Sequence, residues 1–475
     1  MLHLVRARSI VLIAALVVTV AGCGGSSSPP AAFDADAVSA VKAVGRSFVD
    51  SYGRQVIFRG YNARIDGLFQ WDTSLGGHGL APFGEAEAQR FEELGLDVLR
   101  MCVNWSGIEP QPGVYDSAYL DRADAVIELG RKHGFHVLVD MHQDGFATAV
   151  GDDGAPSWAI VPPGTAPPGH AVLNAQSALA TVNFFRDYTG PDGRSLQDAW
   201  IAAAQQIARR HVGDPVIAGY EAYNEPAVPN NGWLDSFNQR FGRGIRAVDP
   251  DANVFFEPLV LRNDLDWALI PASPWPLGGG VYAPHVYTTV FSSPFDGYAT
   301  GTIDDLAPSM QHAEREADGW GAPLFVTELG NDQSNPNGPR FLHDELDLQD
   351  QLLASSTIWV WQEQGTWGLF DTDRAERPDT AFEISRPFPR AVAGELLSIE
   401  RPEAGHMVVR YRATAATGRV PHEISASSAY LASFEVSCDG APAVTSTRTG
   451  RVLVTCPEAV SGSEHTLELD GTTAR

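Results

Sequence analysis

Basic residues are scarce in this sequence. The chain of 475 residues carries 33 Lys and Arg against 59 Asp and Glu, which gives a formal net charge of −26 at pH 7. Nucleic-acid binding needs a basic surface that neutralises phosphates, so this balance argues against nucleic acid as a partner. It also disfavours simple electrostatic docking on anionic lipid. Acidity alone identifies no substrate.

Cysteine is scarce as well, with four residues in the chain. No Cys/His spacing resembles a zinc site, and we expect neither a metal nor an organic cofactor. Cys438 and Cys456 lie on neighbouring predicted strands. In an exported protein we expect them to form a disulfide, which would contribute about 3 kcal/mol. Cys102 is expected to be a buried free thiol beside Met101.

A long N-terminal apolar run is missing. Residues 10–20 are apolar, but the run is too short to span a membrane as a mature helix. It follows a basic start with Arg6 and Arg8 and precedes Val-Ala-Gly-Cys, which ends at Cys23. This pattern resembles the bacterial lipoprotein cleavage box, in which the Cys is lipidated. An ordinary signal peptide with an incidental Cys is the alternative. Both interpretations predict export, and the first adds a membrane anchor.

We predict four segments along the chain. Residues 1–23 are a lipoprotein-type signal peptide, and 24–36 are a flexible tether rich in Gly, Ser and Pro. Residues 37–394 form a large domain. In 395–475 helical signals vanish and short alternating runs appear, which predicts a small antiparallel β-sandwich. The hydrophobic content of 44% and the 11 Trp are typical of a globular protein with a large core. We expect a monomer.

Strand and helix patterns alternate through the large domain. Eight predicted strands with intervening helices favour an α/β fold, a parallel (β/α)8 TIM barrel. A doubly wound open sheet is the alternative, but no Gly-x-Gly-x-x-Gly follows the first strand. We predict strands at 56–61, 97–102, 135–140, 216–223, 253–256, 281–286, 323–327 and 357–361, and helices at 85–94, 117–133, 196–210, 233–246, 306–319 and 347–354.

Two of these strands end on a glutamate. The strand at 216–223 runs into Asn224-Glu225-Pro226, where proline stops it, and Glu328 follows the strand at 323–327. In a TIM barrel the C-terminal strand ends carry the chemistry. Two carboxylates there indicate a general acid and a nucleophile, although a lone glutamate at such a place is more often a solvated strand end.

Other strand-end residues have types that suit pyranoside chemistry. Asn and His can hold sugar hydroxyls, and Asn224 could strengthen a bond to the 2-hydroxyl at the transition state. Arg100 can keep a carboxylate ionised, Tyr287 can donate to the nucleophile, and Trp361 offers a face to the sugar. Each residue alone is more often a packing or surface residue. The full set is Asn62, Arg100, His142, Asn224, Glu225, His285, Tyr287, Glu328 and Trp361.

In their order over residues 50–390, these residues resemble glycoside hydrolase family 5. The resemblance implies that Glu225 is the acid/base, that Glu328 is the nucleophile, and that hydrolysis retains the anomeric configuration. Residues 140–144, Asp-Met-His-Gln-Asp, with Gly-Asp-Asp-Gly-Ala-Pro-Ser-Trp-Ala at 151–159, are similar to the endoglycoceramidases. Those enzymes cleave the β-bond between a glycan and ceramide and carry a β-sandwich after the barrel. A glycosphingolipid substrate is thereby implied, with Asp144 beside the sugar.

One position departs from that pattern. Glucose-recognising members tend to carry Lys four residues after the first-strand Asn, where this sequence has Asp66. We keep Asp66 as a substrate-binding candidate, but lactosylceramide-type specificity does not follow. A galactosylceramide-rooted glycolipid, a simpler β-glycoside or a glycosylated steroid stay open. A retaining enzyme that acts on soluble β-glucan or β-mannan is a further alternative. A non-catalytic glycan-binding lipoprotein is another, although the presence of both glutamates argues against it.

One connection, residues 145–192, is too long for scaffolding alone. It carries Phe146, Trp158 and Phe185, and disordered loops are poor in aromatic residues. We expect these three side chains to line an apolar channel that takes the ceramide tails. A self-packed insertion is the alternative.

Overall fold

The structure is a computed structural model, and part of the chain falls outside what it describes. Cys23, with the predicted signal peptide, and Asp66 lie outside the described residues. Residues Asp34–Arg475 form one compact unit. Among the described residues, no helix is both long and apolar enough to cross a membrane. The described residues are 32–64, 83–167, 169, 171–268, 270–271, 273–287, 290, 298–362, 366–371 and 373–475.

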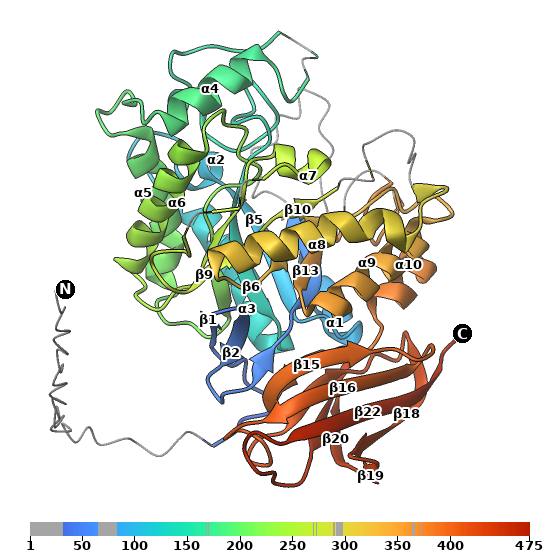
Figure 1. Ribbon diagram of the computed structural model, residues 1–475. Helices are drawn as coiled ribbons and strands as arrows, with labels where there is room; N and C mark the ends of the chain where they lie inside the picture. The colour runs from blue at the N-terminus through green and yellow to red at the C-terminus, as the bar shows by residue number, and fades with distance from the viewer. Residues whose placement is uncertain are drawn as a thin grey trace, which may run out of the picture. The chain divides into compact units, whose positions relative to one another are not determined.

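A parallel β-barrel forms the centre of this unit (Figure 1). Its strands are β4 (Arg59–Arg64), β5 (Val98–Asn104), β6 (His136–His142), β7 (Ile217–Glu221), β8 (Val254–Phe256), β9 (Gly280–Tyr282) with β10 (His285–Val286), β11 (Phe325–Val326) with β12 (Glu328–Leu329), and β13 (Ser355–Ile358). The sheet order is β11-β13-β4-β5-β6-β7-β8-β9. A parallel bridge between Tyr282 and Leu324 joins its two edges, and β10 pairs with β12 beyond it. The predicted TIM barrel is confirmed.

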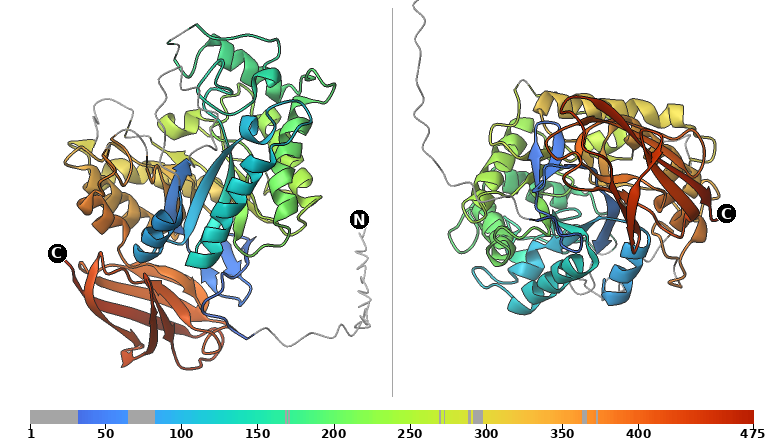
Figure 2. Two further views of the ribbon diagram at one scale, coloured as in Figure 1. Left: turned by 180° about the vertical axis from the view of Figure 1, so that it is seen from behind. Right: turned by 90° about the horizontal axis from the view of Figure 1, so that it is seen from below.

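Helices cover the outside of the barrel (Figures 1 and 2). Capping residues fix their ends, as in the helix that begins after Asp116, whose carboxylate accepts the N–H groups of Ala118 and Tyr119. The helices are α1 (Glu85–Glu93), α2 (Trp105–Ile108), α3 (Ser117–His133), α4 (Ala175–Phe185), α5 (Leu196–Arg210), α6 (Asn231–Arg246), α7 (Leu261–Leu265), α8 (Ile303–Trp320), α9 (Gly338–Leu352) and α10 (Pro378–Ile384).

The N-terminal end of the barrel is closed by apolar side chains. An N-terminal hairpin of β1 (Val41–Val44) and β2 (Ser47–Asp50) brings Phe48 under the strands. Its ring centroid lies 5.2 Å from that of Phe58 and 6.2 Å from that of Phe325. Packed aromatic rings therefore fill this end of the barrel.

Two antiparallel sheets form the C-terminal β-sandwich, as predicted. One has the order β15-β16-β22-β18-β19. The other, β1-β2-β3-β14-β17-β21-β20, combines strands from both ends of the chain. It therefore crosses the predicted domain boundary between residues 394 and 395. The remaining strands are β3 (Gln55–Val56), β14 (Pro389–Val392), β15 (Gly394–Glu400), β16 (His406–Ala413), β17 (His422–Ser425), β18 (Leu431–Cys438), β19 (Ala441–Pro442), β20 (Val444–Arg448), β21 (Arg451–Thr455) and β22 (Glu464–Thr473).

Cys438 and Cys456 form the expected disulfide, with 5.7 Å between their Cα atoms. Cys438 ends β18 in one sheet, and Cys456 directly follows β21 in the other. The bond therefore joins the two sheets of the sandwich. Cys102 is a buried free thiol on β5.

Candidate active site

Glu225 and Glu328 meet at the C-terminal end of the barrel. Glu328 begins β12, and Glu225 lies four residues beyond the end of β7. His285 stands between them: its Nδ1 is 2.9 Å from Oε1 of Glu225 and 3.4 Å from Oε2 of Glu328. One carboxylate oxygen of each glutamate and one ring nitrogen of His285 all lie within 4.8 Å of one another. The two predicted carboxylates thus face each other across one small space.

Glu225 is held from both its backbone and its side chain. Its φ is +47°, in the left-handed region that non-glycine residues rarely adopt, and its N–H donates to Oε2 of Glu257 at 3.0 Å. Nδ2 of Asn263 donates to Oε1 at 2.8 Å. The Glu225 side chain is 26% exposed, so the carboxyl group reaches the open cleft.

Glu328 is more deeply buried, with 6% of its side chain exposed. Nη1 of Arg100 lies 2.6 Å from Oε1, and the Tyr287 hydroxyl donates to Oε2 at 2.9 Å. Burial raises the pKa of the Glu328 carboxyl, while the charges of His285 and Arg100 oppose that rise. Both donors favour the carboxylate form, which is the form a nucleophile needs.

Arg100 is the centre of a buried charge network beneath the pair. Its guanidinium has no exposed surface. Burial works against the charge, yet the surrounding carboxylates, Asp140 and Glu221 first among them, raise the pKa of Arg100 well above its ordinary value. Arg100 is therefore a fixed cation. Its neighbours are Asp140 at 3.1 Å, Glu221 at 2.5 Å, Glu257 at 3.6 Å, Glu328 at 2.6 Å, and the side-chain oxygens of Asn62 and Asn224, each at 2.8 Å.

A cavity of about 320 Å³ opens above this network. Its volume is at the lower end of the range for small-molecule sites. Two tryptophan rings and several polar groups share its wall, a combination that suits a sugar ring. The lining residues are Arg64, His142, Asp144, Asn224, Glu225, Tyr287, Glu328, Trp359 and Trp367.

The polar residues predicted for the sugar come together at this cavity or directly beneath it. His142 has Nδ1 2.6 Å from Oδ2 of Asp140, and its ring stacks on Trp359 with centroids 5.5 Å apart. Asp144 pairs with Arg64 at 2.8 Å. Asn62 is fully buried and donates to the Thr327 carbonyl at 3.0 Å, so it supports the site from below.

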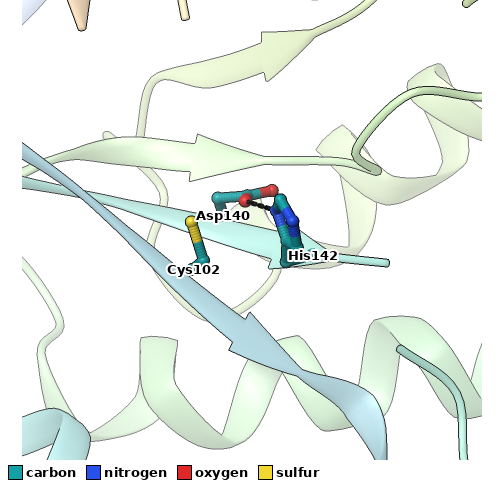
Figure 3. A group of neighbouring side chains, drawn as sticks. All are labelled: Cys102, Asp140 and His142. Carbon is teal, nitrogen blue, oxygen red and sulfur yellow. Dashed lines mark hydrogen bonds and ion pairs between the residues drawn. The ribbon is translucent and has the colours of Figure 1, made fainter. Parts of the chain in front are cut away.

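Some of these side chains also have the composition of a cation site. Cys102 on β5 lies beside Asp140 and His142 on β6 (Figure 3). The latter two side chains contact each other through Oδ2 of Asp140 and Nδ1 of His142. Burial raises the pKa of the Cys102 thiol to about 11, so this side chain is a neutral thiol. Arg100 already supplies positive charge at Asp140, with Nη2 3.1 Å from Oδ2. We therefore derive no metal chemistry from this group.

Trp361 does not have the position that we predicted for it. It is 2% exposed and packs against Tyr61, Phe91 and Phe370 in the core. The predicted strand ended at Trp361, but β13 ends at Ile358. The first tryptophan beyond the strand tip is therefore Trp359, and this residue lines the cavity.

The predicted lipid channel also needs correction. Phe146 has no exposed surface, and Phe185 is 3% exposed and packs on Tyr223 and Phe237. Trp158 is half-buried, donates to the Glu109 carbonyl at 3.1 Å and does not line the cavity. Phe146 and Phe185 have almost no surface left for a lipid, because both side chains pack into the core. This agrees with the alternative of a self-packed insertion.

Sequence reasoning missed several residues that complete the site. Glu257-Pro258 directly follows β8 and repeats the Glu-Pro pattern of Glu225-Pro226, which is a usable signal. The missed residues in loops and in the short helix α7 are not marked by a comparable sequence pattern. The missed residues are Arg64, Glu221, Glu257, Asn263, Trp359 and Trp367.

The geometry of the two carboxylates indicates one class of chemistry. Retaining glycosidases place their carboxyl groups about 5–5.5 Å apart, whereas inverting enzymes need about 6.5–9.5 Å to admit a water. The approach of Glu225 and Glu328 oxygens to within 4.8 Å fits the retaining arrangement. Glu225, exposed to the cleft, suits the acid/base, and Glu328, paired with Arg100, suits the nucleophile.

Comparisons with known proteins agree with this geometry. The family model described as cellulase (glycosyl hydrolase family 5) matches residues 49–365. The chain is 26% identical to endoglycoceramidase I from Rhodococcus hoagii (strain 103S) over 435 residues, 85% of this chain and 83% of the relative.

Solved structures show the same fold. Endo-glycoceramidase II from Rhodococcus sp. superposes with a TM-score of 0.74 at 24% identity, over 90% of this chain and 100% of that one. A structure described as an endogalactoceramidase gives 0.74 at 22% identity, over 91% and 100%. With the family match over residues 49–365 and the two glutamates in place, this chain belongs to glycosyl hydrolase family 5.

Proposed function

We propose that this protein is a retaining endo-β-glycosidase that hydrolyses the β-bond between the glycan and ceramide of a glycosphingolipid, releasing an intact glycan and ceramide. The similarity to an endoglycoceramidase over 85% of the chain supports this choice. The structural observation that carries it is the apolar outer side of α7, next to the acid/base.

Helix α7 joins an exposed apolar surface to the catalytic pair. Its inner side carries Asn263, which is buried and donates to Glu225. Its outer side and the residues after it leave large apolar side chains in solvent. Soluble proteins leave such groups of side chains exposed mainly at binding sites, so this surface suits the aglycone of a lipid substrate. The exposed residues are Leu261, Leu265, Trp267 and Ile270.

The first chemical step forms a glycosyl-enzyme. The Glu328 carboxylate attacks the anomeric carbon of the sugar that is linked to ceramide, and the bond to the ceramide oxygen breaks. The carboxyl proton of Glu225 passes to that oxygen, so ceramide leaves as a neutral alcohol. Arg100 and Tyr287 hold the nucleophile, each by a contact to one of its two oxygens.

The second step frees the glycan. Glu225, now a carboxylate, takes a proton from a water that attacks the anomeric carbon. The bond to Glu328 breaks and the nucleophile is again a carboxylate. Two displacements at one carbon return the original β configuration. Trp359 and Trp367 at the cavity wall offer ring faces to the C–H side of the sugar.

The same tryptophans favour the second candidate, a retaining β-glycosidase that acts on soluble or steroid β-glycosides. Trp359 and Trp367 line the cavity, and their ring faces suit a sugar ring whatever is attached to it. The two functions differ in the aglycone, and hence in whether the apolar side of α7 contributes.

We also propose that the chain is exported and anchored in a membrane through a lipid on Cys23. The basic start, the short apolar run and the Val-Ala-Gly-Cys pattern support this placement. The Cys438–Cys456 disulfide is of the kind that persists in oxidising compartments. An anchor would keep the enzyme beside a membrane-bound substrate.

Mass spectrometry of the products from a glycosphingolipid panel tests the main proposal. The panel contains glucose-linked and galactose-linked ceramides, matched alkyl and aryl β-glycosides, a steryl glucoside, and soluble β-glucan and β-mannan. We expect intact glycan and free ceramide from at least one glycolipid, with kcat/KM above that for the aryl glycoside of the same sugar. Turnover of soluble glycans alone would reject the proposal.

A further inference from the structure

Glu257 is a buried carboxylate directly behind the acid/base, and the mechanism above leaves it without a role. It follows β8 and is 3% exposed. Oε2 accepts the backbone N–H of Glu225 at 3.0 Å. Oε1 lies 3.3 Å from Nε2 of His285 and 3.6 Å from Nη2 of Arg100. Glu257 therefore reaches Glu225 by two routes, through the backbone and through the imidazole.

His285 has a carboxylate on each side of its ring. Nε2 faces Glu257, while Nδ1 faces Oε1 of Glu225 at 2.9 Å and Oε2 of Glu328 at 3.4 Å. Nε2 and Oε1 of Glu257 face each other at 3.3 Å without forming a hydrogen bond, so what attracts them is the charge of an imidazolium beside a carboxylate. Burial opposes the charge, but Glu257 and Glu328 raise the pKa of His285 well above its ordinary value. The doubly protonated ring fits this position.

The donors around Glu225 determine which of its oxygens can carry the catalytic proton. Nδ2 of Asn263 lies 2.8 Å from Oε1, and Nδ1 of His285 lies 2.9 Å from the same atom. With two N–H groups directed at it, Oε1 has no place for an O–H of its own. The proton that Glu225 gives and takes must then be on Oε2.

We propose that Glu257 is a positioning residue for proton transfer: by holding His285 doubly protonated, it keeps Oε1 of Glu225 an acceptor, so that the catalytic proton moves only on and off Oε2. In the first step the charged N–H stabilises the anion that forms as Glu225 releases its proton. The inference rests on retaining glycosidase chemistry and is independent of the lipid part of the substrate.

Other charged groups near His285 also affect whether its ring is singly or doubly protonated. Arg100 opposes a second positive charge nearby, and His142 adds to this opposition if charged. Carboxylates outnumber these cations, so the balance favours the imidazolium. The groups, by element, are Arg100 on β5, Asp140 and His142 on β6, Glu221 on β7, Glu225 after β7, Glu257 after β8, Tyr287 after β10 and Glu328 on β12.

Glu257→Gln tests the inference with little change in shape. The glutamine can still offer an oxygen to the Glu225 N–H, but it has no charge to hold the second proton on His285. A neutral His285 stabilises the Glu328 carboxylate less, so the pKa of Glu328 rises. We expect the acidic limb of the pH profile of kcat/KM, which reports the nucleophile, to move about one unit to higher pH, measured on an unactivated phenyl β-glycoside that the wild type cleaves.

Glu221→Gln is the matched control. Glu221 is an equally buried carboxylate, but it pairs with Arg100 at 2.5 Å and with the Thr327 hydroxyl at 3.1 Å. Its loss leaves Glu257 and His285 in place, so we expect the acidic limb not to move to higher pH. An acidic limb that stays fixed in Glu257→Gln, or that moves equally in both variants, would overturn the inference.

A measurement on the wild type keeps the test independent of folding in the variants. In histidine-labelled protein, ¹⁵N NMR separates the imidazolium from either neutral tautomer, and the His285 signals are assigned by their absence in His285→Asn. We expect both ring nitrogens of His285 to carry protons at pH 6.5. A neutral ring there would overturn the inference even if Glu257→Gln did not fold. Activity on the phenyl glycoside establishes the glycosidase chemistry separately.

Discussion

Nδ2 of Asn263 lies 2.8 Å from Oε1 of Glu225, and this contact ties a helix at the rim of the site to the acid/base. The same helix exposes Leu265, and Trp267 follows it; each is 63% exposed. One short element thus presents a polar inner side to the catalytic pair and an apolar outer side to solvent. A lipid that covered the outer side would lie next to the bond that breaks.

Removing that apolar surface should separate lipid from soluble substrates. Burying a Leu or Trp side chain is worth about 1.5–3 kcal/mol, so Leu265→Ser with Trp267→Ser should lower kcat/KM on a glycolipid at least tenfold. Activity on a soluble aryl glycoside of the same sugar should be unchanged. Phe185→Ala is the control, because this core residue should cost about 3–5 kcal/mol of stability without discriminating between substrates. Equal losses on both substrates in the double variant would remove α7 from the lipid site.

The two catalytic glutamates should respond differently to the leaving group. Glu328→Gln should abolish turnover of every substrate, because it removes the nucleophile. Glu225→Ala should lose about 10²–10⁴-fold on the natural substrate but spare the first step of a dinitrophenyl glycoside, whose leaving group needs no proton. Azide should then rescue Glu225→Ala and give a β-glycosyl azide, detected by mass spectrometry. Equal losses on both substrates without rescue would mean that the roles are wrongly assigned.

Arg100 should set the acidic limb of the pH profile. The contact between Nη1 and Oε1 of Glu328, at 2.6 Å, opposes the rise in the Glu328 pKa that burial causes. Arg100→Lys loses the planar fork, so the nucleophile's pKa rises and the acidic limb of kcat/KM moves to higher pH. Arg100→Met removes the charge altogether and should cost about 3–5 kcal/mol of stability, because it leaves buried carboxylates unpaired. An acidic limb that stays in place in Arg100→Lys would argue against this pairing.

Two tryptophans only two residues apart should behave in opposite ways. Trp359 lines the cavity and stacks on His142, so Trp359→Ala should raise KM for a soluble glycoside while stability falls little. Trp361 is buried among aromatic rings, so Trp361→Ala should lower the free energy of unfolding by about 3–5 kcal/mol. Thermal melts and steady-state kinetics on both variants check this. The reverse pattern would restore the sequence-based assignment of Trp361 to the sugar.

The catalytic pair could be predicted from sequence because strand ends are locally encoded. Glu225 stands before a proline that ends a strand, and Glu328 follows a short apolar run. Trp359 was missed because the last strand was predicted to end three residues too late. Trp361 was therefore assigned to the sugar in place of Trp359. Glu257 carries a similar local signal, a carboxylate and a proline directly after β8, and it could have been included.

Contacts between segments far apart in the chain could not be predicted from local sequence patterns. The aromatic residues of the 145–192 connection suit either a lipid wall or a core, and periodicity does not separate these. In the structure Phe185 is in the core with Tyr223. Nor does local sequence indicate that Val56 in β3 pairs with Ala391 in β14, since that contact joins segments more than 300 residues apart. The role of Asn263 also depends on where a five-residue helix packs.

Glu225 and Glu328 should together release an intact glycan from ceramide with retention. Real-time ¹H NMR can follow this reaction on a glycolipid in detergent micelles, such as lactosylceramide or a digalactosylceramide. We expect the whole glycan as the first sugar product, with its reducing end appearing as the β-anomer before mutarotation. An α-anomer as the first product, or single sugars released from the far end of the glycan, would contradict it.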